Sequence, residues 1–138
     1  MIKSRGLKHI QLTVRNLERS VHFYRSVLGL QHKFDGGPDA AFLTTPGSHD
    51  IITLNASRDP ARAGEMGGVA HFGFHLEDLP DFERALEEAV KAGGRVAKRG
   101  VRATVDCPEE PWAFLADPDG YIVEVYSPTA KLTGPEPA

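Results

Sequence analysis

Three residues have side chains that suit a metal site: His9, His71 and Glu124. Each lies within or at the start of a short run of alternating apolar residues, a pattern that predicts a β-strand. Two imidazoles and one carboxylate are a set that holds a divalent metal on one side and leaves coordination positions open for a substrate. If the fold brings the three residues together, the sequence predicts a metalloenzyme.

The chain divides into two halves that repeat one pattern. Both histidines are followed by leucine eight residues later, and the Ala-Phe-Leu triplet at 41–43 recurs at 113–115, an offset of 72 residues. Carried forward without a gap, this offset sets Glu124 opposite Ile52. The repeat therefore predicts four equivalent positions, of which three have metal-binding side chains and the fourth has isoleucine.

Each half is expected to contain a strand, a helix and three further strands. Asn16 and Asp78 are suited to cap the two helices, and glycines follow the last apolar residue of each. In the first half we expect strands over 7–14, 30–34, 40–44 and 50–55, with a helix from 17 to 28. In the second half we expect strands over 69–76, 95–97, 112–116 and 121–126, with a helix from 79 to 92. The pattern predicts an α+β fold of two βαβββ modules.

We expect residues 1–138 to form a single domain. Its parts are a first module over 7–55, a connector over 56–68, a second module over 69–127 and a tail over 128–138. The connector is rich in glycine, alanine and charged residues. This composition favours a mobile linker over a lid that covers a site.

Composition excludes several classes of function. The net charge of −3 gives no reason to expect nucleic acid or an anionic membrane as a partner. No apolar run approaches the ~20 residues that a membrane-spanning helix needs, and the first residues do not resemble a secretory signal. The single cysteine, Cys107, rules out an internal disulfide and fits a reducing cytoplasm. It has no evident activating partner, so we do not expect a nucleophile there.

Glu124 is the only acid in its strand. A carboxylate buried without a partner costs several kcal/mol, so Glu124 needs either a cation or exposure to water. For each histidine taken alone, an exposed or hydrogen-bonded core residue is the plainer interpretation. Their equivalent positions in the repeat favour metal ligands.

Four segments resemble signature motifs of the vicinal oxygen chelate superfamily, which includes glyoxalases, extradiol dioxygenases, fosfomycin-resistance transferases and bleomycin-binding proteins. They are KHIQLTV at 8–14, FYRSVLGL at 23–30, AHFGF at 70–74 and DPDGYIVE at 117–124. The resemblance spans about residues 7–127 and is specific for the superfamily but not for an activity within it.

The resemblance implies paired βαβββ modules that form a mixed-sheet cleft, the glyoxalase/dioxygenase-like fold. A divalent metal would sit in the cleft, with His9, His71 and Glu124 as ligands and a small-molecule substrate that chelates it through adjacent oxygens. Fe²⁺ or Mn²⁺ is favoured, and Ni²⁺, Co²⁺ or Zn²⁺ also suits these ligands. The resemblance further implies a homodimer in which His9 meets His71 and Glu124 of the other subunit, although one chain can in principle close its own cleft.

Ile52 bears on the reaction. Among the enzymes that the chain resembles, glyoxalase I and methylmalonyl-CoA epimerase have Glu or Gln at this fourth position, where the side chain serves as a metal ligand or a base. Isoleucine does neither, which argues against an isomerase. Extradiol dioxygenases and fosfomycin transferases use three ligands. The segment 47–51 resembles the dioxygenase segment whose histidine acts as acid and base, so His49 is the catalytic candidate. An exposed turn histidine is the alternative.

Other features weaken or widen this interpretation. The chain has one module pair where typical extradiol dioxygenases have two, and Phe114 and Leu115 stand where those enzymes usually have tyrosine. A basic cluster at Lys98, Arg99 and Arg102 suits a phosphonate, but a solvated loop is favoured there. Further candidates for the substrate cleft are Gln11, Thr13, His75, Trp112 and Tyr126.

Three functions remain beside an extradiol-dioxygenase-like oxidoreductase acting on a catechol-like substrate. They are a fosfomycin-type thiol transferase, a glyoxalase-like lyase and a metal-free antibiotic-binding protein. The intact ligand set favours an enzyme, because drug-binding relatives commonly lose these ligands.

Overall fold

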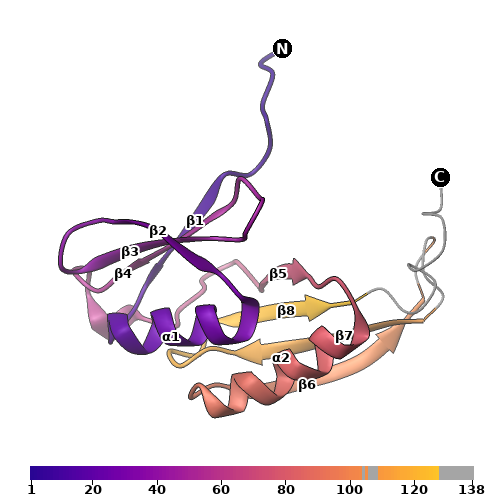
Figure 1. Cartoon of the computed structure of the whole chain (residues 1–138). Coiled ribbons are helices and arrows are strands. Elements are labelled where there is room, and N and C mark those ends of the chain that lie inside the picture. Colours follow the sequence, from indigo (N-terminus) through magenta and orange to yellow (C-terminus); the bar gives the residue numbers. More distant parts are fainter. Residues whose placement is uncertain (104, 106–108, 128–138) are drawn as a thin grey trace.

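A computed structural model describes residues 1–103, 105 and 109–127, and within these it forms two modules of the same architecture (Figure 1). The first contains β1 (His9–Thr13), α1 (Leu17–Leu28), β2 (Gln31–Asp35), β3 (Ala40–Thr44) and β4 (Ile51–Asn55). The second contains β5 (Phe72–His75), α2 (Leu79–Lys91), β6 (Arg95–Arg102), β7 (Glu110–Ala116) and β8 (Ile122–Tyr126). A 3₁₀ turn, η1 (Pro60–Arg62), lies between the modules. Cys107 and the tail at 128–138 lie outside the described residues.

The two sheets have the same topology. Their strand orders are β1-β4-β3-β2 and β5-β8-β7-β6, and in each sheet the first pair is parallel while the other pairs are antiparallel. The predicted α+β fold of two βαβββ modules is confirmed. No helix in the described part of the chain is long and apolar enough to cross a membrane.

The helix caps are those that the sequence predicts. The side chains of Asn16 and Asp78 accept hydrogen bonds from the backbone N–H groups of Arg19 and Asp81, three residues further on. Gly29 ends α1 in a left-handed conformation, with φ of 66°. Both helices therefore begin at the residue after the predicted cap.

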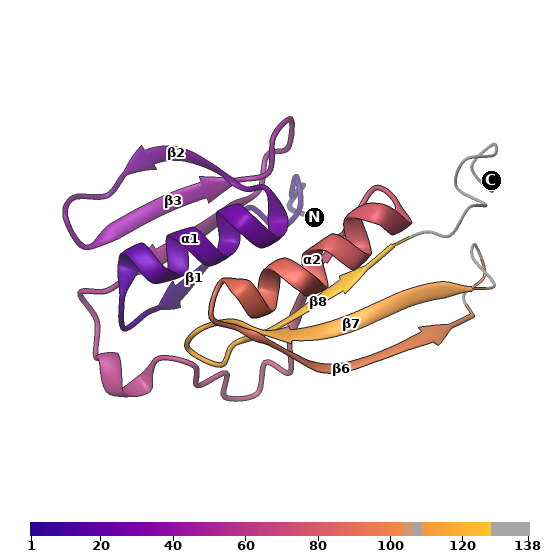
Figure 2. The same cartoon turned by 60° about the horizontal axis from the view of Figure 1, so that its bottom comes forward.

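Each helix covers one face of its own sheet, and the two helices pack against each other (Figure 2). The buried side chains of both modules form a single apolar core, in which Tyr24, Phe82 and Leu115 are among the largest members. Successive strand residues point to opposite faces. One face of each sheet therefore contributes to this core, and the other carries the polar candidates.

The register of the sheets corrects the repeat. Phe42 pairs with Thr53 in the first sheet, and Phe114 pairs with Glu124 in the second. The β3–β4 turn covers 45–50 and the β7–β8 turn covers 117–121, so the first turn is one residue longer. Thr53 is therefore the counterpart of Glu124, and the prediction of Ile52 is wrong by one residue. Ile52 belongs to the buried core.

The connector over 56–68 is not a free linker. Ala63 is buried, and its carbonyl oxygen accepts a hydrogen bond from Arg15 Nη2 at 3.0 Å. Gly64 packs so tightly on the Asp119 carbonyl that a Cβ there would lie 2.1 Å from its oxygen. Met66 Sδ accepts a hydrogen bond from the Ile122 N–H at 3.4 Å. These contacts hold the connector against both modules.

Candidate functional site

The face of the second sheet opposite α2 gathers charged and aromatic side chains. Directly paired residues of antiparallel strands share a face. The pairs Phe114–Glu124, Trp112–Tyr126, Lys98–Phe114 and Arg102–Glu110 therefore project together. We call this the site face, and its residues are His71, His75, Lys98, Arg102, Glu110, Trp112, Phe114, Glu124 and Tyr126.

The site face brings together two of the three predicted ligands. His71 Nε2 lies 3.0 Å from Glu124 Oε2. His71 precedes β5, and its ring lies 4.8 Å from the ring of Phe114, which fixes one side of the imidazole. Glu124 lies in β8 and is only 7% exposed. A buried carboxylate beside an imidazole is a ligand pair suited to a transition metal.

The second oxygen of Glu124 has unused capacity. Oε1 is buried, and among the buried side-chain nitrogen and oxygen atoms of the described residues it is the one without a hydrogen bond. Arg102 Nη2 reaches it at 2.7 Å as an ion pair, but without the alignment of a hydrogen bond. A carboxylate oxygen held in this way still has lone pairs for a cation. The residues therefore fit a divalent metal at Glu124 and His71.

Arg102 is a functional candidate that the sequence analysis placed in a solvated loop. That prediction is wrong, because β6 continues to Arg102 and pairs it with Glu110. Arg102 Nε donates to Glu110 Oε1 at 2.8 Å, and its guanidinium lies 5.4 Å from the ring centre of Tyr126. Burial lowers the pKa of Arg102, but the carboxylates of Glu110 and Glu124 more than offset this and raise it. The guanidinium therefore stays charged.

Aromatic rings border the ligand pair. The ring of His75 stacks on Tyr126, with centres 4.9 Å apart and planes at 16°. Trp112 lies over Gly100 and 5.1 Å from Phe114, with Lys98 Nζ 5.9 Å from its ring centre. His75, Trp112 and Tyr126 thus lie on the same face as His71 and Glu124. Flat rings beside a polar centre suit a planar substrate.

His9 lies in the first sheet. It is exposed in β1 and borders a cavity of about 550 Å³, whose far side includes Gly73 and His75 of β5. Within the described residues of one chain, no three His, Cys, Asp or Glu side chains are close enough to hold a metal. One chain therefore brings His71 and Glu124 together without His9.

His49 lies in the exposed β3–β4 turn, at the end of the first sheet where His9 lies. Its carbonyl oxygen accepts a hydrogen bond from Lys8 Nζ at 3.0 Å. His9 pairs with Ile51, two residues after His49. The histidine proposed as acid and base is therefore close in the fold to the third ligand candidate.

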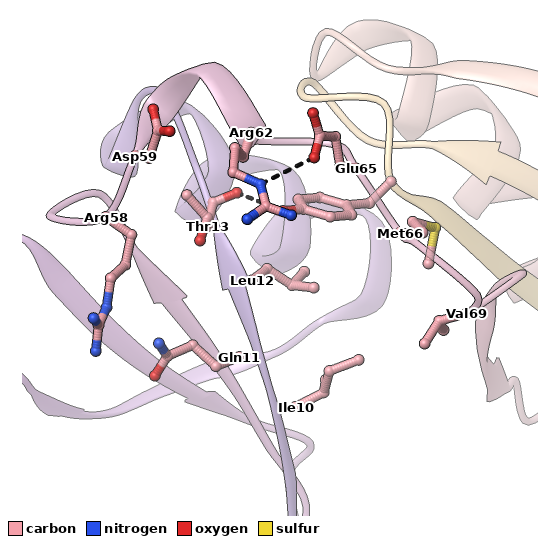
Figure 3. Close-up of a pocket in the computed structure, with 11 residues that line it drawn as sticks. Ile10, Gln11, Leu12, Thr13, Arg58, Asp59, Arg62, Glu65, Met66 and Val69 are labelled. Atoms are coloured by element: carbon pink, nitrogen blue, oxygen red, sulfur yellow. Dashed lines mark hydrogen bonds and ion pairs between the residues drawn. The ribbon is translucent and has the colours of Figure 1, made fainter.

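Gln11 and Thr13 line a different cavity, of about 660 Å³, along the free edge of β1 (Figure 3). The connector forms its other wall, including an ion pair between Arg62 and Glu65 at 3.1 Å. Neither His71 nor Glu124 borders this cavity. Within one chain, these two cleft candidates are thus apart from the ligand pair.

A buried polar network holds the strand of Glu124 against the first module. In the β7–β8 turn, Asp119 Oδ1 is bound by Arg15 and Arg19 at 3.2 Å each, and Asp117 Oδ2 accepts a hydrogen bond from Tyr24 Oη at 2.7 Å. Burial raises the pKa of both Asp117 and Tyr24. The sequence predicts only a turn here, because the partners lie about a hundred residues away along the chain.

The chain has recognisable relatives. A sequence profile described as "Glyoxalase/Bleomycin resistance protein/Dioxygenase superfamily" matches residues 6–125. A catechol-2,3-dioxygenase of Bacillus subtilis is 30% identical over 129 residues, which cover 91% of this chain and 42% of that protein. The chain therefore spans less than half the length of this relative.

Two further matches have other names. The metallothiol transferase FosB of Staphylococcus epidermidis is 25% identical over 126 residues, which cover 91% of this chain and 84% of that protein. A solved glyoxalase/bleomycin resistance protein from Albidiferax ferrireducens has the same fold. Its TM-score is 0.70 at 20% identity, over 88% of this chain and 97% of that one.

Proposed function

We propose that this chain, which belongs to the glyoxalase/bleomycin resistance protein/dioxygenase superfamily, is a divalent-metal enzyme acting on a small substrate with adjacent oxygens. His71 and Glu124 would hold the metal, and His9 would be the third protein ligand. The observation that carries the proposal is the imidazole of His71, whose Nε2 lies 3.0 Å from the buried carboxylate of Glu124. An imidazole and a carboxylate in contact are a donor pair that binds divalent transition metals.

A bound ion would supply Lewis acidity and open positions for two substrate oxygens. Two imidazoles and one carboxylate suit Fe²⁺, Mn²⁺, Co²⁺, Ni²⁺ and Zn²⁺. We favour Fe²⁺ or Mn²⁺, because the reaction proposed below consumes O₂.

The proposed site is completed across a homodimer. His9 is exposed on the first sheet, and α2 leaves the site face of the second sheet uncovered. In the proposed dimer, the first sheet of one subunit lies opposite the site face of the other. Each site then has one histidine from one subunit and the His71–Glu124 pair from the other.

The reaction we favour is extradiol cleavage of a catechol-like ring. The relative with 30% identity is named a catechol-2,3-dioxygenase. Thr53 at the counterpart of Glu124 has a hydroxyl group, which is a poor substitute for the Glu or Gln expected of an isomerase. Trp112 and Tyr126 would border a planar ring, and His49 would accept the catechol proton and return it after ring opening. The overall reaction adds both atoms of O₂ to the ring and needs no outside reductant.

A thiol transferase is the second candidate. Lys98 and Arg102 place positive charge on the site face, and this suits the phosphonate of fosfomycin. The FosB relative supports the same alternative. A glyoxalase-like lyase would need a base that Thr53 does not provide.

Oxygen uptake tests the favoured reaction. Metal-free protein is loaded anaerobically with Fe²⁺ and mixed with a panel of catechols in an oxygen-electrode cell. We expect one O₂ consumed per ring cleaved, and a fall of about 100-fold in rate for His49→Ala, with unchanged iron content. Thiol-dependent loss of fosfomycin without oxygen uptake would assign the transferase instead. Tight antibiotic binding with neither activity would indicate a binding protein.

A further inference from the structure

Glu124 has two partners of different kinds on its two oxygens. His71 lies against Oε2 at 3.0 Å, and the Arg102 guanidinium lies against Oε1 at 2.7 Å. His71 is itself a proposed metal ligand, whereas arginine always stays protonated in proteins and does not bind metals. A metal that draws on Oε1 therefore brings a second positive charge to an oxygen that Arg102 already neutralises, and the two cations compete for it.

Arg102 has two other partners that it can keep when its guanidinium moves away from Glu124. Its Nε is bound to Glu110 Oε1 at 2.8 Å, and Glu110 is largely buried, with a side chain 13% exposed. Tyr126 lies under the guanidinium at 5.4 Å. Only Nη2 reaches Glu124, so the side chain can release this carboxylate while keeping a charge partner and an aromatic neighbour.

We propose that Arg102 is the resident counter-cation of Glu124, that a metal ion competes with it for this carboxylate, and that this competition lowers the metal affinity of the site. The inference rests on the proposed function. Arg102 acts here as a positioning residue, since it holds the carboxylate ready and neutralised before the metal arrives. Without Arg102, the buried Glu124 would have a stronger need for a metal.

The chain has a matched control in the same strand. Arg99 pairs with Glu83 at 2.9 Å and lies 5.7 Å from the ring of Phe82, a residue of α2. It therefore projects to the helix side of the sheet, away from Glu124. Arg99→Met removes the same charge as Arg102→Met but leaves Glu124 and its partners in place.

The test is Mn²⁺ binding by the metal-free full chain, measured from the electron paramagnetic resonance signal of free Mn²⁺. We expect Arg102→Met to bind Mn²⁺ about tenfold more tightly than wild type, and Arg99→Met to stay within about twofold. Glu110→Gln has the opposite expected sign, about threefold weaker binding, because Arg102 then depends on Glu124 alone. Wild-type affinity or weaker binding in Arg102→Met overturns the inference.

The outcomes separate the two proposals. If wild type and Arg102→Met bind Mn²⁺ equally well, the metal site stands and the role of Arg102 falls. If neither binds Mn²⁺, Co²⁺ or Zn²⁺, the metal function itself falls, and the inference with it.

A second measurement uses wild type and does not depend on the folding of a variant. Arginine Nη–H signals are followed by nuclear magnetic resonance during titration with Zn²⁺, with Arg102→Met used only for assignment. We expect the Arg102 signal to shift in step with Zn²⁺ binding while the Arg99 signal stays fixed. An unmoved Arg102 signal at saturation would overturn the inference.

Discussion

The two sheets have one architecture, but the residues at their matching central positions differ. In the first sheet Gln11 pairs with Thr53, and in the second Gly73 pairs with Glu124. A Cβ at Gly73 would lie 3.1 Å from the Glu124 carbonyl oxygen and 3.3 Å from its Cβ. In the second sheet the carboxylate of β8 thus has a glycine beside it in β5, where the first sheet has a glutamine in β1. The comparison indicates that a buried acid in this fold needs a neighbouring residue without a side chain as well as a cation.

The histidines are the common element. His9 and His71 occupy matching positions in the two sheets, yet only the second sheet supplies a carboxylate and a charged arginine beside its histidine. The first sheet offers an imidazole on its own. The proposed three-ligand site therefore combines one face of each kind.

The largest expected effect is on the ligand pair. His71→Ala should lower the affinity for Mn²⁺ by at least about 100-fold, because it removes one of the three proposed protein ligands. The control is His75→Ala, on the same face but stacked on Tyr126, which should change the affinity less than about threefold. Calorimetric titration measures both. Near-wild-type affinity in His71→Ala would show that the His71–Glu124 pair does not distinguish the second sheet as the metal-binding one.

The second effect is on stability. Thr53→Glu gives the first sheet the acid of the second, but Thr53 is 2% exposed and pairs with Gln11, where the acid of the second sheet pairs with a glycine. We expect a loss of about 3 kcal/mol or more in the free energy of unfolding, measured with urea. Adding Gln11→Gly should recover part of this loss. An unchanged free energy of unfolding in Thr53→Glu would show that the space beside this position does not determine which sheet can hold the acid.

The third effect concerns the space beside Glu124. Gly73→Ala should cost about 1–2 kcal/mol and weaken Mn²⁺ binding severalfold, because the added methyl group presses on the glutamate backbone and Cβ. Gly68→Ala is the control, since its Cβ would meet nothing within 4 Å. Equal effects on metal binding would mean that Gly73 has no special relation to Glu124.

The smallest expected effect is on the pH dependence of stability, and it distinguishes the turn before β4 from the turn before β8. Asp117 is buried in the second, and burial raises its pKa despite hydrogen bonds from Tyr24 and from backbone N–H groups. The folded chain then takes up this proton more readily than the unfolded chain, so its stability should rise as pH falls from above the raised pKa toward about 3.9.

Urea unfolding of wild type and Asp117→Asn across this pH range checks the expectation. Asparagine has no proton to gain, so wild type should gain stability relative to the variant at the lower pH. A constant difference between the two would contradict the raised pKa.

The sequence predicted the order and type of the elements, because capping residues and alternating apolar positions are local signals. It missed the register by one residue, since the two turns differ in length by one and few identities relate the halves. Arg102 was missed because β6 has charged residues where a buried strand would have apolar ones. Its partners, Glu110 and Glu124, come from other strands, so only the folded chain brings them together.

Metal content tests the central claim most directly. Metal-free chain is saturated with Mn²⁺ or Fe²⁺, freed of unbound ion by gel filtration and analysed for bound metal, beside Glu124→Gln treated in the same way. The account predicts one equivalent per chain for wild type and less than about a tenth of an equivalent for Glu124→Gln. Wild type below a tenth of an equivalent, or Glu124→Gln with a full equivalent, would contradict it.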